Sequence, residues 1–213
     1  MWVVKVGGSL SASDDLSAWL DVLAELGGGR VVIVPGGGPF ADQVRRSQAR
    51  WDFDDTVAHH MALLAMEQYG WMLAGMRPEL QCASSIAGIC QALSNGRVPV
   101  WLPGQLAACA QDIPPSWDIT SDSLAAWLAN TLAAECLTLV KSIQPTESVV
   151  LAAALAEYGL VDPLFPVLTA HSRYDIRMMG KDQHGLMQLA LLTGESHGTR
   201  VDTVAARRGV RIQ

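Results

Sequence analysis

A lysine inside a short apolar segment is the first residue of this chain whose setting suggests chemistry. The chain begins "MWVVKVGGSL", so Lys5 stands among valines and is followed by Gly7 and Gly8. An ammonium group buried without a partner is strongly destabilising, so a buried Lys5 needs an anionic partner. Glycines after a strand let backbone N–H groups approach phosphate oxygens, and the next helix adds its positive N-terminus. The alternative is a simple tight turn, with the lysine side chain reaching solvent.

A second glycine loop repeats this arrangement. In "VVIVPGGGPF" an apolar run ends in Gly36, Gly37 and Gly38, and a helix is predicted to follow. Two such loops side by side could hold a polyphosphate and a transferring phosphoryl group from two sides. Neither loop fits the Walker pattern GxxxxGKS/T or the dinucleotide pattern GxGxxG. The phosphate-binding residues predicted from the two loops are Gly7, Gly8, Ser9, Gly36, Gly37 and Gly38.

An aspartate in a third segment is a candidate partner for Lys5. In "WDITSDSLAAWLA", Thr120 and Ser121 can cap a helix, which places Asp122 in the first turn of that helix. A carboxylate there is favoured by the helix dipole, so a capping role alone would explain Asp122. The functional alternative is that Asp122 pairs with Lys5 and holds it in place between the phosphates. The two roles are compatible.

The elements that must position these residues are those of an α/β fold. Two strand–glycine loop–helix units follow each other, and their strands are almost continuously apolar, as in a parallel sheet covered on both faces. No repeat or composition shift marks a linker, so residues 1–213 are expected to form one domain. Strands are predicted at residues 2–6, 30–34, 98–102 and 136–140. Helices are predicted from residue 11 or 13 to 26, from the GGG loop to residue 50, and over residues 54–76, 121–134 and 147–158. Residues 174–201 are predicted to form a strand, a turn, a helix, a turn and a strand.

Composition and charge argue against several classes of function. The formal net charge is −6 and no stretch concentrates Lys and Arg, so we expect no nucleic-acid partner. No segment approaches the roughly 20 apolar residues that span a membrane, and the chain does not begin like a signal peptide. The four cysteines form no CxxC pair and have no zinc-ligand spacing to the histidines, so we expect buried, reduced thiols in a cytoplasmic protein that contributes no metal ligands. These cysteines are Cys82, Cys90, Cys109 and Cys136.

Taken together, the motifs resemble the amino acid kinase family, which includes acetylglutamate, aspartate, carbamate and uridylate kinases. The segments "VVKVGGSL", "VVIVPGGGPFADQVR", "WDITSDSLAAWLA" and "LTGESHGTRV" occur in the family's order, from Val3 to Val201. The resemblance implies a three-layer αβα sandwich with a mainly parallel central sheet and an ATP-dependent kinase activity. It also implies that the strand lysine and the glycine loops bind the transferring phosphoryl group while the aspartate organises the lysine. Lys5 and Asp122 take these catalytic roles here.

Within the family, several segments look most like the small kinases of methanofuran biosynthesis. These segments are "GGGPFADQVR", "WDITSDS", "LVKSI" and "GLVDPLFP". Such kinases convert the phosphate of an aminomethylfuran-methanol to its diphosphate with ATP, so the resemblance implies that acceptor, a small phosphate monoester. It further implies a homo-oligomer, as in related enzymes. We expect Mg²⁺ to bridge ATP oxygens and, because few carboxylates are available near the motifs, to rest mainly on phosphates and water.

One departure from the family concerns its second phosphate-binding lysine. Acetylglutamate-type enzymes carry that lysine in a "GGM-x-x-K" segment, which we do not find in this chain. Lys141 ends "CLTLVK", where relatives often have a threonine–aspartate pair beside the nucleotide, and we expect it to replace the lysine or to contact the nucleotide's phosphates. Lys181 in "MGKDQHG" is a second candidate. Ser142 and Asp162 complete the predicted nucleotide site, although a simple turn before Pro163 would also explain Asp162.

The predicted acceptor site uses residues that follow the second glycine loop or belong to the third segment. Arg45 could bind the acceptor's phosphate with its forked guanidinium, and the alternative is a solvated helix face. His59 and His60 open a Met-rich helix, and a neutral imidazole could line the pocket. We assign this role to His60 and expect one of the two histidines to lie at the surface. Thr120 and Ser121 complete the predicted site.

Two other functions stay open at this point. One is a kinase of the same family with another acceptor, such as a nucleoside monophosphate or an acyl carboxylate. The other is a binding or storage protein that keeps a nucleotide site without turnover. The absent second-lysine segment favours this last function, whereas the intact Lys5 and Asp122 oppose it.

Overall fold

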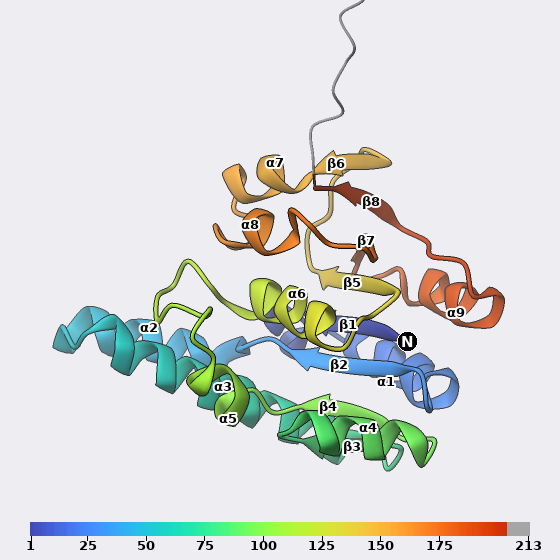
Figure 1. Cartoon of the computed structure of the whole chain (residues 1–213), viewed down its shortest axis with the longest axis horizontal. Coiled ribbons are helices and arrows are strands. Elements are labelled where there is room, and N and C mark those ends of the chain that lie inside the picture. Colours follow the sequence, from blue (N-terminus) through green and yellow to red (C-terminus); the bar gives the residue numbers. More distant parts are fainter. Residues whose placement is uncertain (204–213) are drawn as a thin grey trace, which may run out of the picture.

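A sheet of eight strands runs through the centre of the described structure (Figure 1). The computed structural model describes residues 1–203. Its strands are β1 (Trp2–Val6), β2 (Val31–Pro35), β3 (Leu80–Ala83), β4 (Val98–Trp101), β5 (Cys136–Lys141), β6 (Val149–Leu151), β7 (Asp175–Gly180) and β8 (Thr199–Asp202). They lie in the order β3-β4-β2-β1-β5-β7-β8-β6. Neighbouring strands are parallel except β7 and β8, which are antiparallel.

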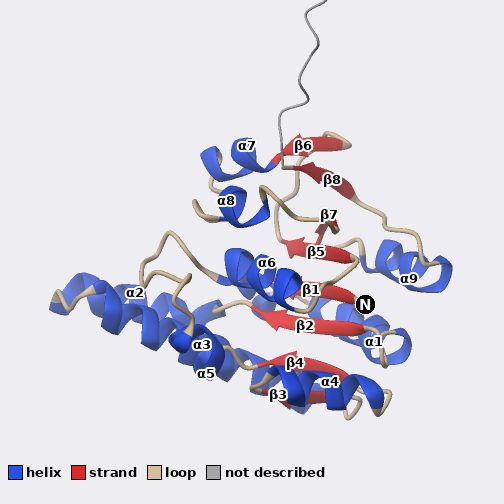
Figure 2. Ribbon diagram, viewed as in Figure 1, coloured by secondary structure: helices blue, strands red, loops and turns tan. Residues whose placement is uncertain are grey.

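Helices cover both faces of this sheet (Figure 2). They are the 3-10 helix η1 (Gly8–Ala12) and the α-helices α1 (Asp15–Leu26), α2 (Gly38–Trp51), α3 (Asp55–Met76), α4 (Ile86–Ser94), α5 (Gly104–Cys109), α6 (Ser121–Thr131), α7 (Ala152–Glu157), α8 (Phe165–Thr169) and α9 (His184–Thr193). Successive residues of β1 point to opposite faces. Val3 therefore packs in one core cluster with Leu124 of α6, and Val4 packs in another with Trp19 of α1. The predicted αβα fold with a mainly parallel sheet is confirmed.

The strand order reverses at β1. From β1 the chain passes through η1 and α1 to β2 on one side, and it later reaches β5 on the other side through α6. Val6, the last residue of β1, is paired with Pro35 and with Val140. Ligands of open α/β sheets bind at the carboxyl ends of the strands where the order reverses. This edge is also where α2 and α3 extend together past the strands (Figure 1).

Local sequence explains how α2 and α3 begin. Pro39 lies in the first turn of α2, where its missing N–H costs no hydrogen bond and its fixed φ suits a helix. Asp54 precedes α3, and its carboxylate accepts a hydrogen bond of 2.8 Å from the Val57 N–H. Two helices that start at defined residues and pack along each other form the floor of the site described below.

The helix predicted over 147–158 is only partly correct. The structure has a strand, β6, followed by the short helix α7. Val149 and Val150 are β-branched, which favours a strand, and they pair with Arg200 and Val201 of β8. That partner lies about 50 residues further along the chain, so the local helical pattern did not reveal it. Strand β3 and helix α4, within residues 77–97, were likewise not predicted.

Three of the four cysteines are less buried than expected. All four thiols are free, but only Cys136 is buried, Cys82 is half-buried, and Cys90 and Cys109 are exposed. Burial of all four thiols was therefore a wrong prediction.

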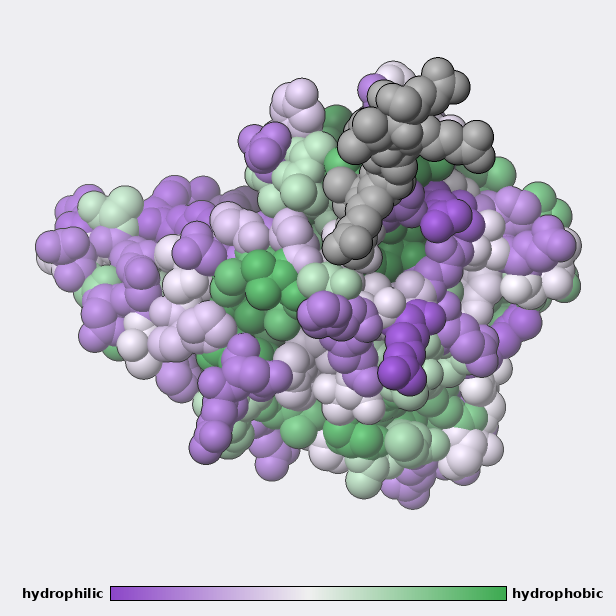
Figure 3. Space-filling view, turned by 45° about the horizontal axis from the view of Figure 1, so that its top comes forward, coloured by the Kyte–Doolittle hydropathy of each residue, from purple (hydrophilic) through white to green (hydrophobic). Residues whose placement is uncertain are grey.

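On the face shown in Figure 3, hydrophilic residues cover most of the surface and hydrophobic residues form separate patches. Across residues 1–203, no helix combines the length and the apolar character that crossing a membrane requires.

Candidate active site

Lys5 and Asp122 form a buried ion pair at the centre of the sheet. The Lys5 Nζ lies 2.8 Å from Oδ1 of Asp122, and each side chain is about 5% exposed. Lys5 shares the face of β1 with Val3, and α6 packs on that face, so the first turn of α6 brings Asp122 over the strand. The ion pair predicted from the sequence is present.

Lys141 approaches the same carboxylate from the next strand. Its Nζ lies 2.5 Å from Oδ2 of Asp122. In the sheet Lys5 is paired with Leu139, which packs in the α6 cluster. Because side chains alternate along a strand, Lys141, two residues later, also points to the α6 face. One carboxylate thus joins two ammonium groups, and the cluster carries a net positive charge beside the strand ends.

The pKa values of Lys5 and Asp122 keep this pair charged near neutral pH. Burial lowers the pKa of Lys5 to about 8; Asp122 opposes this shift and the ammonium of Lys141 reinforces it. Burial alone would raise the pKa of Asp122, but the charges and hydrogen bonds of the two lysines outweigh it and lower the pKa. Ammonium groups held in place at low exposure are suited to bind an anion and to stabilise negative charge that develops during a reaction.

The two glycine loops pack backbone against backbone at the ends of β1 and β2. A Cβ atom on Gly8 would lie 2.2 Å from the Gly38 nitrogen, and one on Gly36 would lie 2.4 Å from the Gly8 nitrogen. Gly38 has a φ of +54°, which other residues rarely adopt. The glycines are therefore required for the loops to meet. The first N–H groups of α2 have no partners within the helix and lie at this junction, which suits an anion.

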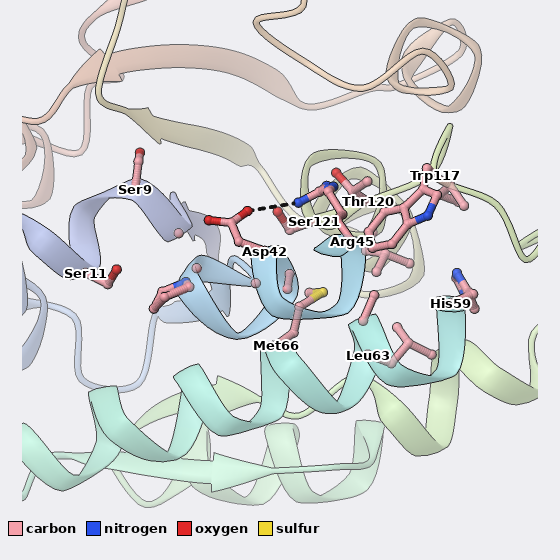
Figure 4. Close-up of a pocket in the computed structure, with 18 of the residues that line it drawn as sticks. Ser9, Ser11, Asp42, Arg45, His59, Leu63, Met66, Trp117, Thr120 and Ser121 are labelled. Atoms are coloured by element: carbon pink, nitrogen blue, oxygen red, sulfur yellow. Dashed lines mark hydrogen bonds and ion pairs between the residues drawn. The ribbon is translucent and has the colours of Figure 1, made fainter. Parts of the chain in front are cut away.

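A cavity of about 410 Å³ opens beside this junction (Figure 4). Gly8, Gly37 and Gly38 belong to its wall at one side, and Ser121, the neighbour of Asp122, belongs to it as well. Lys5, Asp122 and Lys141 themselves are not part of this wall. The remaining wall residues come from η1, α2, α3, α6 and the segment before α6, and they include Ser9, Ser11, Asp42, Arg45, His59, Leu63, Met66, Trp117, Thr120 and Leu124.

Arg45 lies in the cavity wall, as predicted for an acceptor-binding residue, and its partners were not predicted. Its guanidinium carbon lies 4.3 Å from the centre of the Trp117 ring, and its Nη1 lies 3.3 Å from Oδ1 of Asp42. The Trp117 indole donates a 2.7 Å hydrogen bond to Oε1 of Gln48 on α2. The segment before α6 is thereby fixed to α2 over the cavity. Trp117 opens the third motif, "WDITSDSLAAWLA", and this tryptophan was the unused signal in the sequence.

The histidine assignment needs correction. His59 lies in the cavity wall, whereas His60 is exposed and its Nδ1 lies 2.8 Å from the Thr56 carbonyl oxygen. The residues of α3 that face the cavity are spaced by three and four, and this periodicity selects residue 59 together with Leu63 and Met66. His60 is one position out of step with that face, which explains why it points to solvent.

Asp162 does not have the setting of a nucleotide-binding residue. Its carboxylate is buried and accepts hydrogen bonds from the Thr120 N–H at 2.8 Å, the Thr120 hydroxyl at 2.7 Å and the Ser123 N–H at 3.3 Å. The Ser123 hydroxyl donates to it as well. Burial and the nearby Asp122 carboxylate raise the pKa of Asp162, against these hydrogen bonds. Asp162 thus caps α6 from a distant segment and anchors the turn that carries Asp122.

The other predicted nucleotide residues lie on the β5 side of the site. Ser142 is exposed directly after β5. A hollow of about 440 Å³ lies near this segment, between the residues that follow Ser142, β6 and α7. The hollow is lined by Gln144, Pro145, Thr146, Glu147, Val150, Leu151, Ala154, Leu155, Tyr158 and Leu160. Lys181 lies elsewhere, beside α1, where its Nζ is 3.8 Å from a carboxylate oxygen of Asp15.

Known proteins resemble the chain both in sequence and in fold. Residues 1–144 match the sequence profile of the amino acid kinase family. The chain is 27% identical over 133 residues to the [5-(aminomethyl)furan-3-yl]methyl phosphate kinase of Methanocaldococcus jannaschii, a match that spans 62% of this chain and 61% of that protein. The closing "GTRV" resemblance lies beyond the matched profile, so the profile does not test it.

Solved structures share the fold over nearly the whole chain. The uridylate kinase of Archaeoglobus fulgidus superimposes with a TM-score of 0.71 at 18% identity, covering 94% of this chain and 99% of that one. A structure of isopentenyl phosphate kinase gives a TM-score of 0.65 at 16% identity, covering 95% of this chain and 100% of that one. At such low identity these structures establish the fold alone.

Proposed function

The chain belongs to the amino acid kinase family, and we propose that it transfers the γ-phosphoryl group of ATP to a small phosphate monoester. The observation that carries the proposal is the single carboxylate of Asp122 that joins Lys5 and Lys141 beside two glycine loops. This arrangement supplies fixed positive charge and backbone N–H groups at one place, which is what phosphoryl transfer asks of a protein. The adjacent cavity has room for a small acceptor.

In the proposed reaction a phosphate oxygen of the acceptor attacks the γ-phosphorus of ATP. A new P–O bond forms, the bond from the γ-phosphorus to the β,γ-bridging oxygen breaks, and ADP leaves. The acceptor oxygen is already anionic, so no general base is required. Lys5 and Lys141 stabilise the charge on the transferring group, and Asp122 keeps the two ammonium groups apart and in place.

The nucleotide is assigned to the β5 side of the glycine loops. Lys141 and Ser142 are close to the hollow beside β6 and α7, whose apolar residues suit a base. Within residues 1–203, no three His, Cys, Asp or Glu side chains gather to hold a metal. Mg²⁺ is proposed as the counter-ion of ATP, bound through phosphates and water.

The acceptor we propose is [5-(aminomethyl)furan-3-yl]methyl phosphate, which would become its diphosphate. The kinase from Methanocaldococcus jannaschii carries this compound in its name, and the cavity offers aromatic and apolar walls for a small ring in Trp117, Leu63 and Met66. Arg45 is proposed to contact the acceptor. The other acceptors considered above, a nucleoside monophosphate or an acyl carboxylate, and the binding protein without turnover are outcomes of the test below.

A homo-oligomer belongs to the same proposal. Val57, Leu64 and Trp71 are exposed on α3 at intervals of seven residues, which places them in one stripe along the helix. An apolar stripe of this kind suits a second copy of the chain. Sedimentation velocity of the wild type and of Leu64→Lys would test it; a monomeric wild type would contradict it.

Acceptor profiling tests the proposed function. ADP release from Mg-ATP is measured with the furan phosphate, UMP, AMP and acetylglutamate, and Lys5→Ala serves as the control. Turnover on the furan phosphate that Lys5→Ala abolishes is the expected result. Turnover on a different acceptor would replace the proposed substrate. ATP binding without ADP release on any acceptor would favour the binding protein.

A further inference from the structure

His59 is a buried polar side chain without a protein partner. It is 7% exposed and lies in the wall of the cavity. Among residues 1–203, no hydrogen bond to its ring accompanies the burial. The His60 ring stands edge-on to it, with centroids 6.4 Å apart. Burial and the neighbouring His60 lower the pKa of His59, so its imidazole is neutral near pH 7. A neutral imidazole offers one N–H and one free nitrogen to a ligand.

The place of His59 within the cavity defines what it can reach. In Figure 4, Ser9 and Ser11 lie toward one end of the cavity, and His59 and Trp117 lie toward the other. The glycine loops belong to the Ser9 end. Between the two ends the cavity has apolar walls from Leu63 and Met66. An acceptor whose phosphate lies at the glycine loops therefore extends its opposite end toward His59.

The charges near this end favour a hydrogen-bond donor over a second anion. The guanidinium of Arg45 stacks on the Trp117 ring and is paired with Asp42, so part of its charge is offset. The imidazole adds no charge, and its free nitrogen can accept a hydrogen bond. In the wall formed by the described residues 1–203, the cation is Arg45, and a second phosphate or carboxylate would have to compete with Asp42 for it.

We propose that His59 is a specificity-determining residue that accepts a hydrogen bond from an amino group at the end of the acceptor opposite its phosphate. The proposal rests on the proposed function and deepens it, because it names the chemical feature of the acceptor that the cavity reads. The compound in the name of the Methanocaldococcus jannaschii kinase has a phosphate on one arm of its ring and an aminomethyl group on another. His59 and the glycine loops are arranged to bind these two groups at once.

The test compares two acceptors that differ only at this group. The first is [5-(aminomethyl)furan-3-yl]methyl phosphate, and the second carries a methyl group in place of the aminomethyl group. A hydrogen bond to a charged group is worth roughly a ten- to hundredfold difference in kcat/KM. We expect the wild type to prefer the first acceptor by that factor. His59→Leu should lose the preference through a higher KM for the first acceptor.

Controls keep the outcome decisive. His171→Leu makes the same chemical change at an exposed histidine outside the cavity and should leave the preference intact. His59→Gln retains a hydrogen-bonding group and should retain part of the preference, which covers the case in which His59→Leu folds poorly. Equal kcat/KM of the wild type for both acceptors, or an unchanged preference in His59→Leu, would overturn the proposal.

A failure of the proposed function gives a different result. In that case the wild type turns over neither acceptor. Calorimetry then measures the binding of the two compounds to the wild type and to His59→Leu, which tests the role of His59 independently of turnover. Tighter binding of the amino compound that His59→Leu abolishes would support the role of His59, and equal binding of the two compounds by the wild type would refute it.

Discussion

The Lys141 ammonium lies 2.5 Å from Oδ2 of Asp122, although the two residues come from the end of a strand and the start of a helix. The other oxygen of the same carboxylate faces Lys5 at 2.8 Å. Lys141 therefore completes a cluster of two cations and one anion at the strand ends. That Lys141 replaces the family's second phosphate-binding lysine, or contacts the nucleotide's phosphates, stays a prediction.

Asp122→Asn tests the function of the carboxylate in this cluster. The variant leaves the buried Lys5 ammonium beside the partly buried Lys141 ammonium without an anion between them, so the pKa of Lys5 should fall further. We expect kcat to fall roughly a hundredfold or more, and the alkaline limb of the pH profile to move to lower pH. Steady-state kinetics from pH 6 to 9 measure both. An active variant with an unmoved profile would show that Asp122 only caps α6.

The pKa of Lys5 predicts a pH dependence of activity. Its pKa in the folded protein is about 8, below the ordinary 10.5. In the free enzyme Lys5 loses its charge as pH rises through about 8, so kcat/KM should decrease there. Bound phosphates raise this pKa, which places the decrease of kcat at higher pH. A kcat/KM that is flat beyond pH 9 would contradict the role of a charged Lys5.

Stability should not follow activity in that range. Between about pH 8 and 10.5 the unfolded chain holds more protons at Lys5 than the folded chain does. The contribution of this group to the free energy of unfolding therefore rises with pH. Urea denaturation at pH 7.5 and 9 checks the sign. Loss of activity with unfolding of the protein at pH 9 would mean that the decrease in rate has a different origin.

Asp162→Asn separates a positioning role from nucleotide contact. The substitution removes the charge that holds the first turn of α6, so Asp122 loses its fixed place. We expect kcat to fall about ten- to a hundredfold, with little change in the KM for ATP. Thr120→Ser keeps the hydroxyl donor and should remain close to the wild type. A large rise in the KM for ATP at unchanged kcat would assign Asp162 to the nucleotide instead.

Gly8→Ala tests the contact between the glycine loops. The added methyl group would lie 2.2 Å from the Gly38 nitrogen, so the loops must separate. We expect a loss of about 1–3 kcal/mol in the free energy of unfolding together with a large loss of activity. Gly185→Ala is the matched control, because its Cβ would meet nothing within 4 Å. The control should stay within about 0.5 kcal/mol of the wild type.

Features that depend on neighbouring residues could be predicted from the sequence. Strand β1, the glycine loops and the first turn of α6 carry local signals and were predicted from them. The pairing of Lys5 with Asp122 was one of two roles open for that aspartate, and the family resemblance implied it. The role of Asp162 could not be predicted in this way. Its partners Thr120 and Ser123 are about 40 residues away, and only the folded chain brings them together.

The histidines show a different limit. The residues on one face of a helix are spaced by three or four, and the side chains of two adjacent residues point in directions about 100° apart. His60 was therefore chosen in place of His59, although the helix itself was predicted well. The spacing from Leu63 and Met66 would have corrected the choice, had the cavity been known.

Phosphorus NMR of the reaction products tests the central claim most directly. The protein is incubated with Mg-ATP and [5-(aminomethyl)furan-3-yl]methyl phosphate, and Lys5→Ala is incubated in parallel. The account predicts a new pair of coupled diphosphate resonances that grows in a one-to-one ratio with ADP and is absent with Lys5→Ala. ADP accompanied only by inorganic phosphate, or bound ATP that stays intact, would contradict a kinase that acts on this phosphate monoester.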